Sequence, residues 1–292
     1  MTAVTGFSPD TPPEVRRRVV IVLGLAVLGI SSSAVLIRFM EDIGPITLAA
    51  WRCLGSALIL SPGIGLSYAK LDRRDLGMTT AAGFLLGLHF AVWFASLSYT
   101  TVMRSTVLVA LVPVWTGLLE WGVLGRRPTR AFWLGTTVAL MGVGLMTGGD
   151  FSGGALIGDL LATVGGVLWA LYFILGRQVR QRVEITAYMG LVCAAAALLL
   201  FPLALVWGEA LVGFTEATWG LVLLAIIGPQ LIGHQGTNYA VKYLPATVVS
   251  TTMLLEPVGA TLLAMLLLGE MPGAVACVGG LVVMAGVGLA TR

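Results

Sequence analysis

Long apolar runs follow one another along almost the whole chain, and only short polar connections separate them. A helix needs about 20 mostly apolar residues to cross a bilayer. Only 11% of the residues are charged, against about 25% in ordinary soluble domains, so a soluble fold would have too few polar residues to cover its surface. The alternating pattern of a membrane β-barrel is absent. The sequence therefore predicts an all-α membrane protein.

Charged residues, Pro and Gly divide the apolar sequence into ten predicted transmembrane helices. The polar residues 1–18 predict a short cytoplasmic tail, and the apolar run after Arg18 is too long for the core of a cleavable signal peptide. The predicted spans are 19–39, 45–66, 76–98, 101–124, 129–148, 155–176, 184–207, 217–241, 245–268 and 271–290.

The distribution of basic residues predicts the orientation. With the N-terminus inside the cell, most of the 17 Lys and Arg residues fall in cytoplasmic segments, as the positive-inside rule requires. The opposite connections carry acidic residues such as Asp150, Glu209 and Glu270. We therefore expect a multi-pass protein of the inner (cytoplasmic) membrane with both termini in the cytoplasm.

The two halves of the chain resemble each other. Residues 118–146 align with 262–290 at a constant offset of 144 residues, and each predicted half contains five spans. An odd number of spans inserts the second half upside down, as in the inverted repeats of many transporters. We expect repeats at 19–150 and 151–292. The matched pairs are Pro113 with Pro257, Gly125 with Gly269, Pro128 with Pro272, Gly135 with Gly279, Gly142 with Gly286 and Gly144 with Gly288; at an offset of 139, Arg38 matches Arg177.

Three segments carry a family resemblance: LLEPVGATLLAMLLLGEMPGAVACVGGLVVMAGVGLA (254–290), GDLLATVGGVLWALYFILGR (158–177) and GPITLAAWRCLGSALIL (44–60). They resemble the EamA-type branch of the drug/metabolite transporter superfamily. The resemblance implies two inverted five-helix repeats, a central cavity lined mainly by spans 1, 3, 4, 6, 8 and 9, and export of small organic solutes, often amino acids. The segment of the first repeat that matches the region around Trp169 reads LGISSSAVLIR, with three serines and no tryptophan. We count the middle serine, Ser32, as a substrate-binding candidate.

Glu256 lies near the middle of an apolar span, directly before Pro257. A carboxylate at this depth is costly unless it faces a cavity or a partner. Pro257 cannot donate to the helix ladder, so it should free a carbonyl near Met253 and break the helix locally. Glu256 is therefore a candidate for binding a substrate ammonium or for proton coupling, and the alternative is a hydrogen-bonded carboxyl that seats a kinked helix.

Span 8 contains polar residues at a spacing of four. Gln230, His234 and Asn238 should share one helix face, which predicts either a substrate-facing stripe or hydrogen bonds between helices. His89 and Trp93 are spaced likewise on span 3, and we expect them at the cavity, with simple packing as the alternative.

Trp169 and Tyr172 follow Gly165 and Gly166 on span 6. Aromatic rings beside small residues predict a flat-walled pocket for an apolar or cationic group, and ordinary packing is the alternative. For Arg52 we expect a pair with Glu41 or Asp42, or a side chain that reaches outward, with substrate contact as the alternative.

Glu120 should pair with a nearby arginine. The three cysteines have no metal-ligand spacing, so neither a metal nor a cofactor is expected.

The sequence thus predicts a secondary transporter or facilitator, not an enzyme, that exports neutral or aromatic amino acids by alternating access. Amphipathic cationic drugs or other metabolites are the alternative substrates. An intramembrane enzyme and a non-transporting assembly subunit are remote alternatives. The expected partners are a small-molecule substrate, the lipid bilayer and, if transport is coupled, protons. No nucleic acid is expected. We expect a monomer, with a homodimer as the alternative.

Overall fold

The computed structural model describes residues 6–8, 10–68, 71–148 and 156–292, and the regular structure in these ranges is all helical. The predicted boundary between the repeats, at 150/151, and Asp150 lie outside the described residues. The helices are α1 (Pro13–Ile37), α2 (Pro45–Tyr68), α3 (Arg73–Ser96), α4 (Val102–Val109), α5 (Val112–Gly122), α6 (Arg130–Met146), α7 (Leu156–Val179), α8 (Ile185–Val206), α9 (Glu216–Ala225), η1 (Ile226–His234), α10 (Gln235–Ala240), α11 (Ala246–Thr252), η2 (Met253–Leu255), α12 (Glu256–Leu268) and α13 (Ala274–Ala290).

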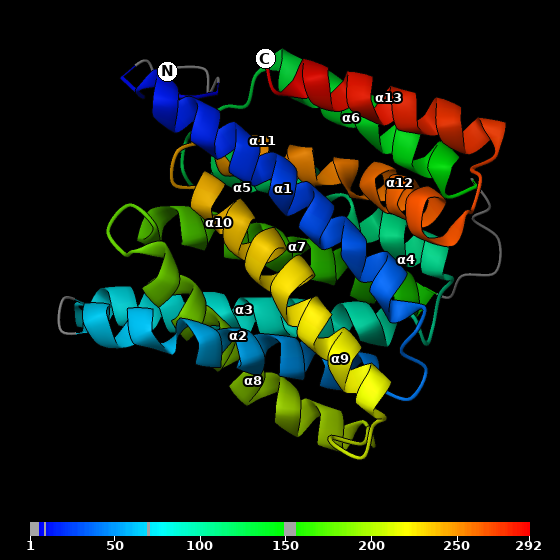
Figure 1. Ribbon diagram of the computed structural model, residues 1–292. Coiled ribbons are helices and arrows are strands. Elements are labelled where there is room, and N and C mark those ends of the chain that lie inside the picture. The colour runs from blue at the N-terminus through cyan, green and yellow to red at the C-terminus, as the bar shows by residue number, and fades with distance from the viewer. Residues whose placement is uncertain (1–5, 9, 69–70, 149–155) are drawn as a thin grey trace.

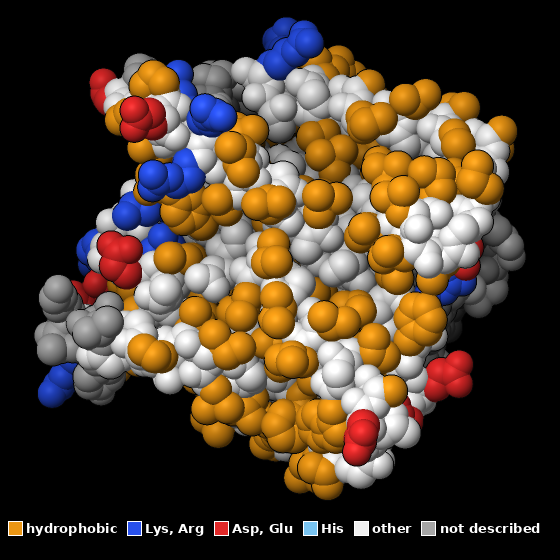
Figure 2. Space-filling model, in the orientation of Figure 1, with side chains coloured by type: hydrophobic (Ala, Val, Ile, Leu, Met, Phe, Trp, Pro, Cys, Tyr) orange, Lys and Arg blue, Asp and Glu red, His pale blue; other side chains and the backbone are white. Residues whose placement is uncertain are grey.

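The helices run back and forth in one bundle, and both chain termini lie at the same end of it (Figure 1). We call this the terminal end, and the end at which α1 finishes the opposite end. Figure 2 shows Lys and Arg side chains gathered at the terminal end and hydrophobic side chains spread over the middle. Large apolar side chains such as Leu58, Leu198 and Leu266 are mostly exposed, as expected for a surface that contacts lipid.

Eight helical segments in the described ranges are long and apolar enough to cross a membrane. The other two predicted spans, 129–148 and 271–290, correspond to the 17-residue helices α6 and α13, which are shorter than the eight. At the N-terminus α1 already begins at Pro13, within the predicted tail, because proline fits the first turn of a helix.

Two of these segments are broken in their middle, each just before a proline. The segment Arg104–Gly122 is interrupted between α4 and α5, ahead of Pro113. The segment Ala246–Leu268 passes through the short 3₁₀ turn η2 before Pro257. The break predicted at Pro257 is therefore confirmed. The carbonyl of Met253 accepts a hydrogen bond from the Glu256 N–H instead, because proline has no N–H to offer.

A third irregularity lies between α9 and α10, where the nine residues of η1 form a π-helix around Pro229. A π-helix pairs each carbonyl with the N–H five residues on. Residues four apart therefore no longer lie in line along this stretch, which changes which side chains face the interior.

The helices α6 and α13 pack against each other through glycines. A Cβ atom on Gly135 would lie 2.5 Å from the carbonyl oxygen of Gly286, and one on Gly142 would lie 2.7 Å from that of Gly279. Any side chain there would collide with backbone, so these glycines allow the two helices to approach closely.

Candidate functional site

A cavity of about 260 Å³ lies between the helices. Its wall is formed by residues of α1 to α7, η1, α11, η2 and α12. On α1 only the last turns contribute, from Ile30 to Ile37, and on α2 only Arg52 in the first half of the helix. These stretches are nearer the opposite end (Figure 1). Ile37, at the end of α1, lines the cavity and is 41% exposed.

One wall of the cavity is aromatic. The ring of His89 stacks on Trp93 with centroids 6.0 Å apart and lies 4.9 Å from Trp169. Phe90 meets the ring of His234 edge-on at 5.7 Å. All five residues line the cavity, although α3, α7 and η1 supply them from distant parts of the sequence. The wall offers flat apolar surface for the body of a small molecule.

The hydrogen bonds of this wall leave polar atoms available. His89 Nδ1 lies 2.9 Å from the carbonyl oxygen of Gly165. A carbonyl only accepts, so Nδ1 carries the proton and Nε2 of the neutral ring is an acceptor. The indole N–H groups of Trp93 and Trp169 and Nδ1 of His234 are buried without a partner among the described residues. Buried polar atoms usually have partners, so a ligand or water is expected beside this wall.

Glu256 lines the cavity from the start of α12. Its backbone contacts α1, because the hydroxyl of Ser31 lies 3.0 Å from the Glu256 carbonyl oxygen and shares its one proton between this oxygen and the carbonyl of Val27, at 2.7 Å. The serine sits against Gly259, where any Cβ would lie 2.3 Å from its Oγ. This contact joins α1 to α12, and the carboxylate is left to face the cavity.

Arg52 lines the same cavity from α2 and is only 4% exposed. Its Nη2 donates to Oε1 of Gln230 at 3.2 Å, and its Nη1 lies 3.5 Å from Oγ of Ser33. The guanidinium carbon lies 5.7 Å from the centre of the Phe90 ring. The predicted pairing with Glu41 or Asp42 is wrong, because none of the ion pairs among the described residues includes Arg52. The Asp42 carboxylate instead accepts from Thr218 and from the Thr215 N–H. The expectation that the side chain reaches outward is also wrong, because it is buried.

The structure brings five of the nine predicted site residues together. His89, Trp93, Trp169, His234 and Glu256 all line the cavity. They come from four elements, α3, α7, η1 and α12.

Three other predicted site residues lie behind the cavity wall. Gln230, Tyr172 and Asn238 are fully buried, and none of them lines the cavity. The amide of Asn238 donates to the hydroxyl of Tyr172 over 2.6 Å, and the amide of Gln230 lies 3.5 Å from Sγ of Cys193. Gln230 and His234 both lie in the π-helix, where the residue spacing of an α-helix does not hold, whereas Asn238 lies beyond it in α10. Gln230 and Asn238 make the alternative contacts between helices instead.

Ser32 does not reach the cavity either. Its hydroxyl donates back to the carbonyl of Gly29 over 2.7 Å, and the side chain lies against Gly228 of η1. Successive residues of a helix point about 100° apart, so three consecutive serines face three ways. Ser31 contacts α12, Ser32 contacts η1, and Ser33 lines the cavity.

Arg52, for which substrate contact was only the alternative, lines the cavity, and so do residues that the sequence did not single out, namely Ser33 and apolar residues such as Phe90 and Phe173. A charged residue inside an apolar span was the available signal for Arg52. No signal in the sequence separates Ser33 from its neighbours. Among the described residues, no group of three His, Cys, Asp or Glu side chains is placed to hold a metal ion.

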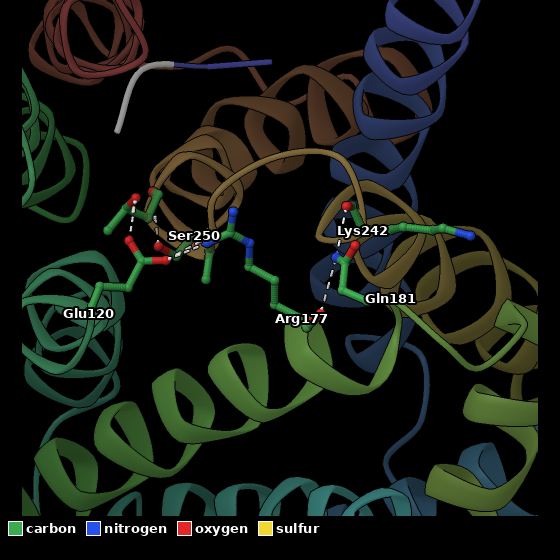
Figure 3. Close-up of polar contacts among 7 residues, drawn as sticks. Glu120, Arg177, Gln181, Lys242 and Ser250 are labelled. Atoms are coloured by element: carbon green, nitrogen blue, oxygen red, sulfur yellow. Dashed lines mark hydrogen bonds and ion pairs between the residues drawn. The ribbon is translucent and has the colours of Figure 1, made fainter. Parts of the chain in front are cut away.

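Toward the terminal end, the buried carboxylate of Glu120 connects the helices α5, α7 and α11 (Figure 3). Glu120 of α5 accepts from Nη1 of Arg177 at 3.3 Å, from the Ala246 N–H at 3.3 Å and from the hydroxyl of Thr247 at 3.0 Å. Ala246 begins α11, where the helix dipole favours an anion. The predicted pairing of Glu120 with an arginine is confirmed. Ser250, one turn further along, lines the cavity.

The chain is similar to known transporters and exporters. The sequence profile of the EamA-like transporter family matches twice, at residues 17–148 and 156–292. An uncharacterized transporter of Archaeoglobus fulgidus is 27% identical over 93% of this chain and 96% of its own length. A pseudopaline exporter of Pseudomonas aeruginosa is 28% identical over 73% of this chain and 74% of its own. A probable terminal-alkyne amino-acid exporter of Streptantibioticus cattleyicolor is 30% identical over 64% and 63%.

A solved crystal structure has the same fold, with a TM-score of 0.79, 21% sequence identity, and coverage of 94% of this chain and 96% of its own. The relatives bear the names of transporters and exporters, not of enzymes. Together with the apolar helices, they identify a multi-pass membrane protein.

Proposed function

Because the chain belongs to the EamA-like transporter family, we propose that it exports small organic solutes, with neutral and aromatic amino acids as the first choice. The observation that carries the proposal is the cavity, which combines a carboxylate (Glu256), a guanidinium (Arg52) and an aromatic wall. A neutral amino acid has the complementary parts: an ammonium, a carboxylate and an apolar body.

The size of the cavity supports a small substrate. Ligand pockets usually have about 300–1,000 Å³, and this one, at about 260 Å³, is at the lower limit. It suits a metabolite better than a large amphipathic drug. The names of two relatives agree with export, and one of them names an amino acid as cargo.

We infer that the chain crosses the membrane ten times, as two inverted repeats at 19–150 and 151–292. The family profile matches once in each half. The glycines of the α6–α13 contact support the inversion. Gly135 and Gly279 correspond at the offset of 144, as do Gly142 and Gly286, and the contacts join Gly135 to Gly286 and Gly142 to Gly279. Such reciprocal pairing is what a two-fold axis produces.

The helices α6 and α13 would be the fifth and tenth spans. With 17 residues each, they are at the lower limit of about 17–25 residues for a span. We place the protein in the inner membrane with both termini in the cytoplasm. Lys and Arg side chains gather at the terminal end (Figure 2), and the positive-inside rule assigns such an end to the cytoplasm.

Transport would proceed by alternating access, in which one repeat moves against the other. The cavity residues of α1 and α2 lie toward the opposite end, and Ile37 among them is partly exposed, which supports an opening on that side. The contacts of Glu120 with Arg177 and Thr247 join helices at the terminal end. This arrangement corresponds to a state open to the outside and closed to the cytoplasm.

The direct test is uptake of radiolabelled amino acids into proteoliposomes that contain the pure protein. We expect saturable uptake of phenylalanine and leucine that exceeds uptake into empty liposomes at least tenfold. Replacing Glu256 by Gln should reduce it about tenfold or more, because a charge-assisted hydrogen bond to the ammonium is lost. The matched control is Glu14→Gln, since Glu14 is exposed at the start of α1.

Repeating the uptake with an imposed pH gradient separates two mechanisms. Accumulation above equilibrium that needs Glu256 indicates proton coupling, and a change of rate alone indicates a facilitator. If the wild-type protein takes up none of the amino acids, the amino-acid proposal fails, and amphipathic cations become the substrates to test.

A further inference from the structure

In the part of the chain that the structure describes, no carboxylate lies within ion-pair distance of the Arg52 guanidinium, although Glu256 lines the same cavity. The ion pairs there are Arg38–Glu270, Arg104–Asp159, Arg177–Glu120 and Arg182–Asp75. The neighbours of the Arg52 guanidinium are an amide, a hydroxyl and an aromatic ring, and its Nε has no partner.

Such a position is energetically unfavourable for the empty protein. Arg52 lies inside a candidate membrane span and is 4% exposed. A charged side chain at membrane depth is costly, and it usually faces a partner or a water-filled cavity. Gln230 and Phe90 compensate part of this cost, but neither of them is an anion. An anion that enters the cavity would provide the missing counter-charge.

Glu256 faces the same cavity without forming an ion pair with Arg52. The two charges come from different parts of the bundle, Arg52 from α2 and Glu256 from the start of α12. Two opposite charges that share a cavity but stay apart fit a ligand with both charges better than a simple cation or anion.

We propose that Arg52 binds the carboxylate of the transported solute, with Gln230 as the residue that positions its guanidinium. The planar fork of an arginine matches a carboxylate, with which it forms two parallel hydrogen bonds. Gln230 already accepts from Nη2 at 3.2 Å and so fixes the plane of the fork. This inference rests on the proposed function, because it assigns the carboxylate end of a zwitterionic substrate, with Glu256 at the ammonium end.

The assignment also predicts selectivity. A cation without a carboxylate would contact Glu256 but would leave the Arg52 guanidinium without a counter-charge, so it should bind more weakly than the zwitterion. The cavity would therefore discriminate against amines and amino-acid esters although their apolar bodies fit the same wall of Phe90, Trp93 and Trp169.

The test measures binding to the purified full-length protein by isothermal titration calorimetry. The probes are phenylalanine, its methyl ester, phenethylamine and 3-phenylpropionate, which share a phenyl group and differ in whether they carry an amine, a carboxylate or both. For the wild-type protein we expect phenylalanine to bind at least tenfold more tightly than the ester or the amine. Equal affinity for phenylalanine and its ester overturns the proposal. This comparison needs no variant, so it is decisive even if changes at Arg52 prevent folding.

Variants then locate the effect. Arg52→Gln should weaken the binding of phenylalanine at least tenfold without weakening the binding of the ester. The affinity of Arg52→Lys for phenylalanine should lie between that of the wild-type protein and that of Arg52→Gln. Gln230→Leu should weaken phenylalanine by a smaller factor without changing the ester. The control is Arg130→Gln, because Arg130 is exposed at the start of α6. A folded Arg52→Gln protein with wild-type affinity for phenylalanine overturns the proposal.

The fourth probe separates this inference from the proposed function. If the wild-type protein neither binds nor transports amino acids, the amino-acid proposal fails. Binding of 3-phenylpropionate that is lost in Arg52→Gln then still supports Arg52 as a carboxylate site. The absence of Arg52-dependent binding of 3-phenylpropionate overturns that site as well.

Discussion

Two arginine–carboxylate pairs lie at the two ends of the bundle, and they differ in burial. At the terminal end Arg177 pairs with Glu120, and their side chains are 22% and 1% exposed. At the opposite end Arg38 pairs with Glu270, and theirs are 54% and 49% exposed. Arg38 directly follows α1, and Arg177 lies in the last turn of α7. Each of these helices is the first one in its half of the chain.

The arginines of the two pairs correspond in the sequence, but their carboxylates do not. Arg38 and Arg177 match at the offset of 139, and each pairs with a carboxylate from the other half of the chain. At the offset of 144, however, Glu120 aligns with Ala264 and Glu270 with Arg126. Under an inverted repeat, two equivalent arginines on opposite sides of the membrane therefore have different partners: the contact at the terminal end is enclosed, and the contact at the opposite end is open to the surroundings.

The largest effect on stability is expected for Glu120→Gln. The change leaves Arg177 without its counter-charge and weakens the hydrogen bonds to Ala246 and Thr247. Removing one partner of a buried ion pair costs about 3–5 kcal/mol, and the partial exposure of Arg177 favours the lower value. We expect the Tm in detergent to fall by about 5–10 °C. A Tm within 1–2 °C of the wild-type value, or roughly that of Glu270→Gln, would contradict this role.

The same variant tests whether the contact closes the terminal end. Ser250 lines the cavity and is 1% exposed. In a protein with Ser250→Cys, and with the exposed Cys277 changed to Ser, a membrane-impermeant maleimide added at the terminal end should label Cys slowly. Adding Glu120→Gln should increase the labelling rate. Equal rates with and without Glu120→Gln would show that the pair does not control access.

Asp42 forms a second contact at the opposite end, which we expect to be stronger than the exposed pair of Arg38 and Glu270. Its carboxylate accepts from the Thr218 hydroxyl at 2.6 Å and from the Thr215 N–H at 3.1 Å, and it thereby holds the α1–α2 connection to the start of α9. The hydrogen bond from Thr218, with that from Thr215, holds the pKa of Asp42 below its usual value. A lowered pKa stabilises the fold above the usual pKa of about 4, and this stability is lost as the pH falls through the folded-state value.

We therefore expect Asp42→Asn to lower the Tm by about 2–4 °C at pH 7 and to have no effect at a pH well below the folded-state pKa. Thermal unfolding of both proteins across this pH range measures the difference. A gap between the two Tm values that stays constant with pH would mean that the Asp42 charge is not the cause.

The smallest effect is expected for Glu270→Gln. The hydrogen bond from Arg38 to Glu270 raises the pKa of Arg38, but both side chains are about half exposed, and exposed pairs contribute little. We expect the Tm to change by about 1 °C or less. A loss of Tm as large as that of Glu120→Gln would mean that the two ion pairs stabilise the protein equally, despite their difference in burial.

Some of the site was readable from the sequence because it depended on local chemistry. Pro257 cannot donate a hydrogen bond, so the break beside Glu256 followed from the residue type alone. Glu120, a carboxylate at the end of an apolar span with basic residues nearby, was expected to find an arginine, and it contacts Arg177.

Other parts were not readable, because they depended on rotation about a helix axis. The spacing of Gln230, His234 and Asn238 predicted one common face, but only His234 lines the cavity. The π-helix η1 changes the register between Gln230 and His234, and Asn238 lies in the next helix, α10. For Arg52 the sequence offered nearby carboxylates, whereas in the bundle its guanidinium meets Gln230 of a helix far along the chain.

The sequence by itself determined the class of the protein, its apolar helices and the matched glycines that allow α6 and α13 to touch. These features follow from hydrophobicity and from the absence of a side chain, which act wherever the residue lies. Only the tertiary structure decided that Ser33, and not Ser32, faces the cavity, and that Arg52 and Glu256 share it without pairing. One residue along a helix turns a side chain by about 100°, so the packing of distant helices decides which polar groups meet.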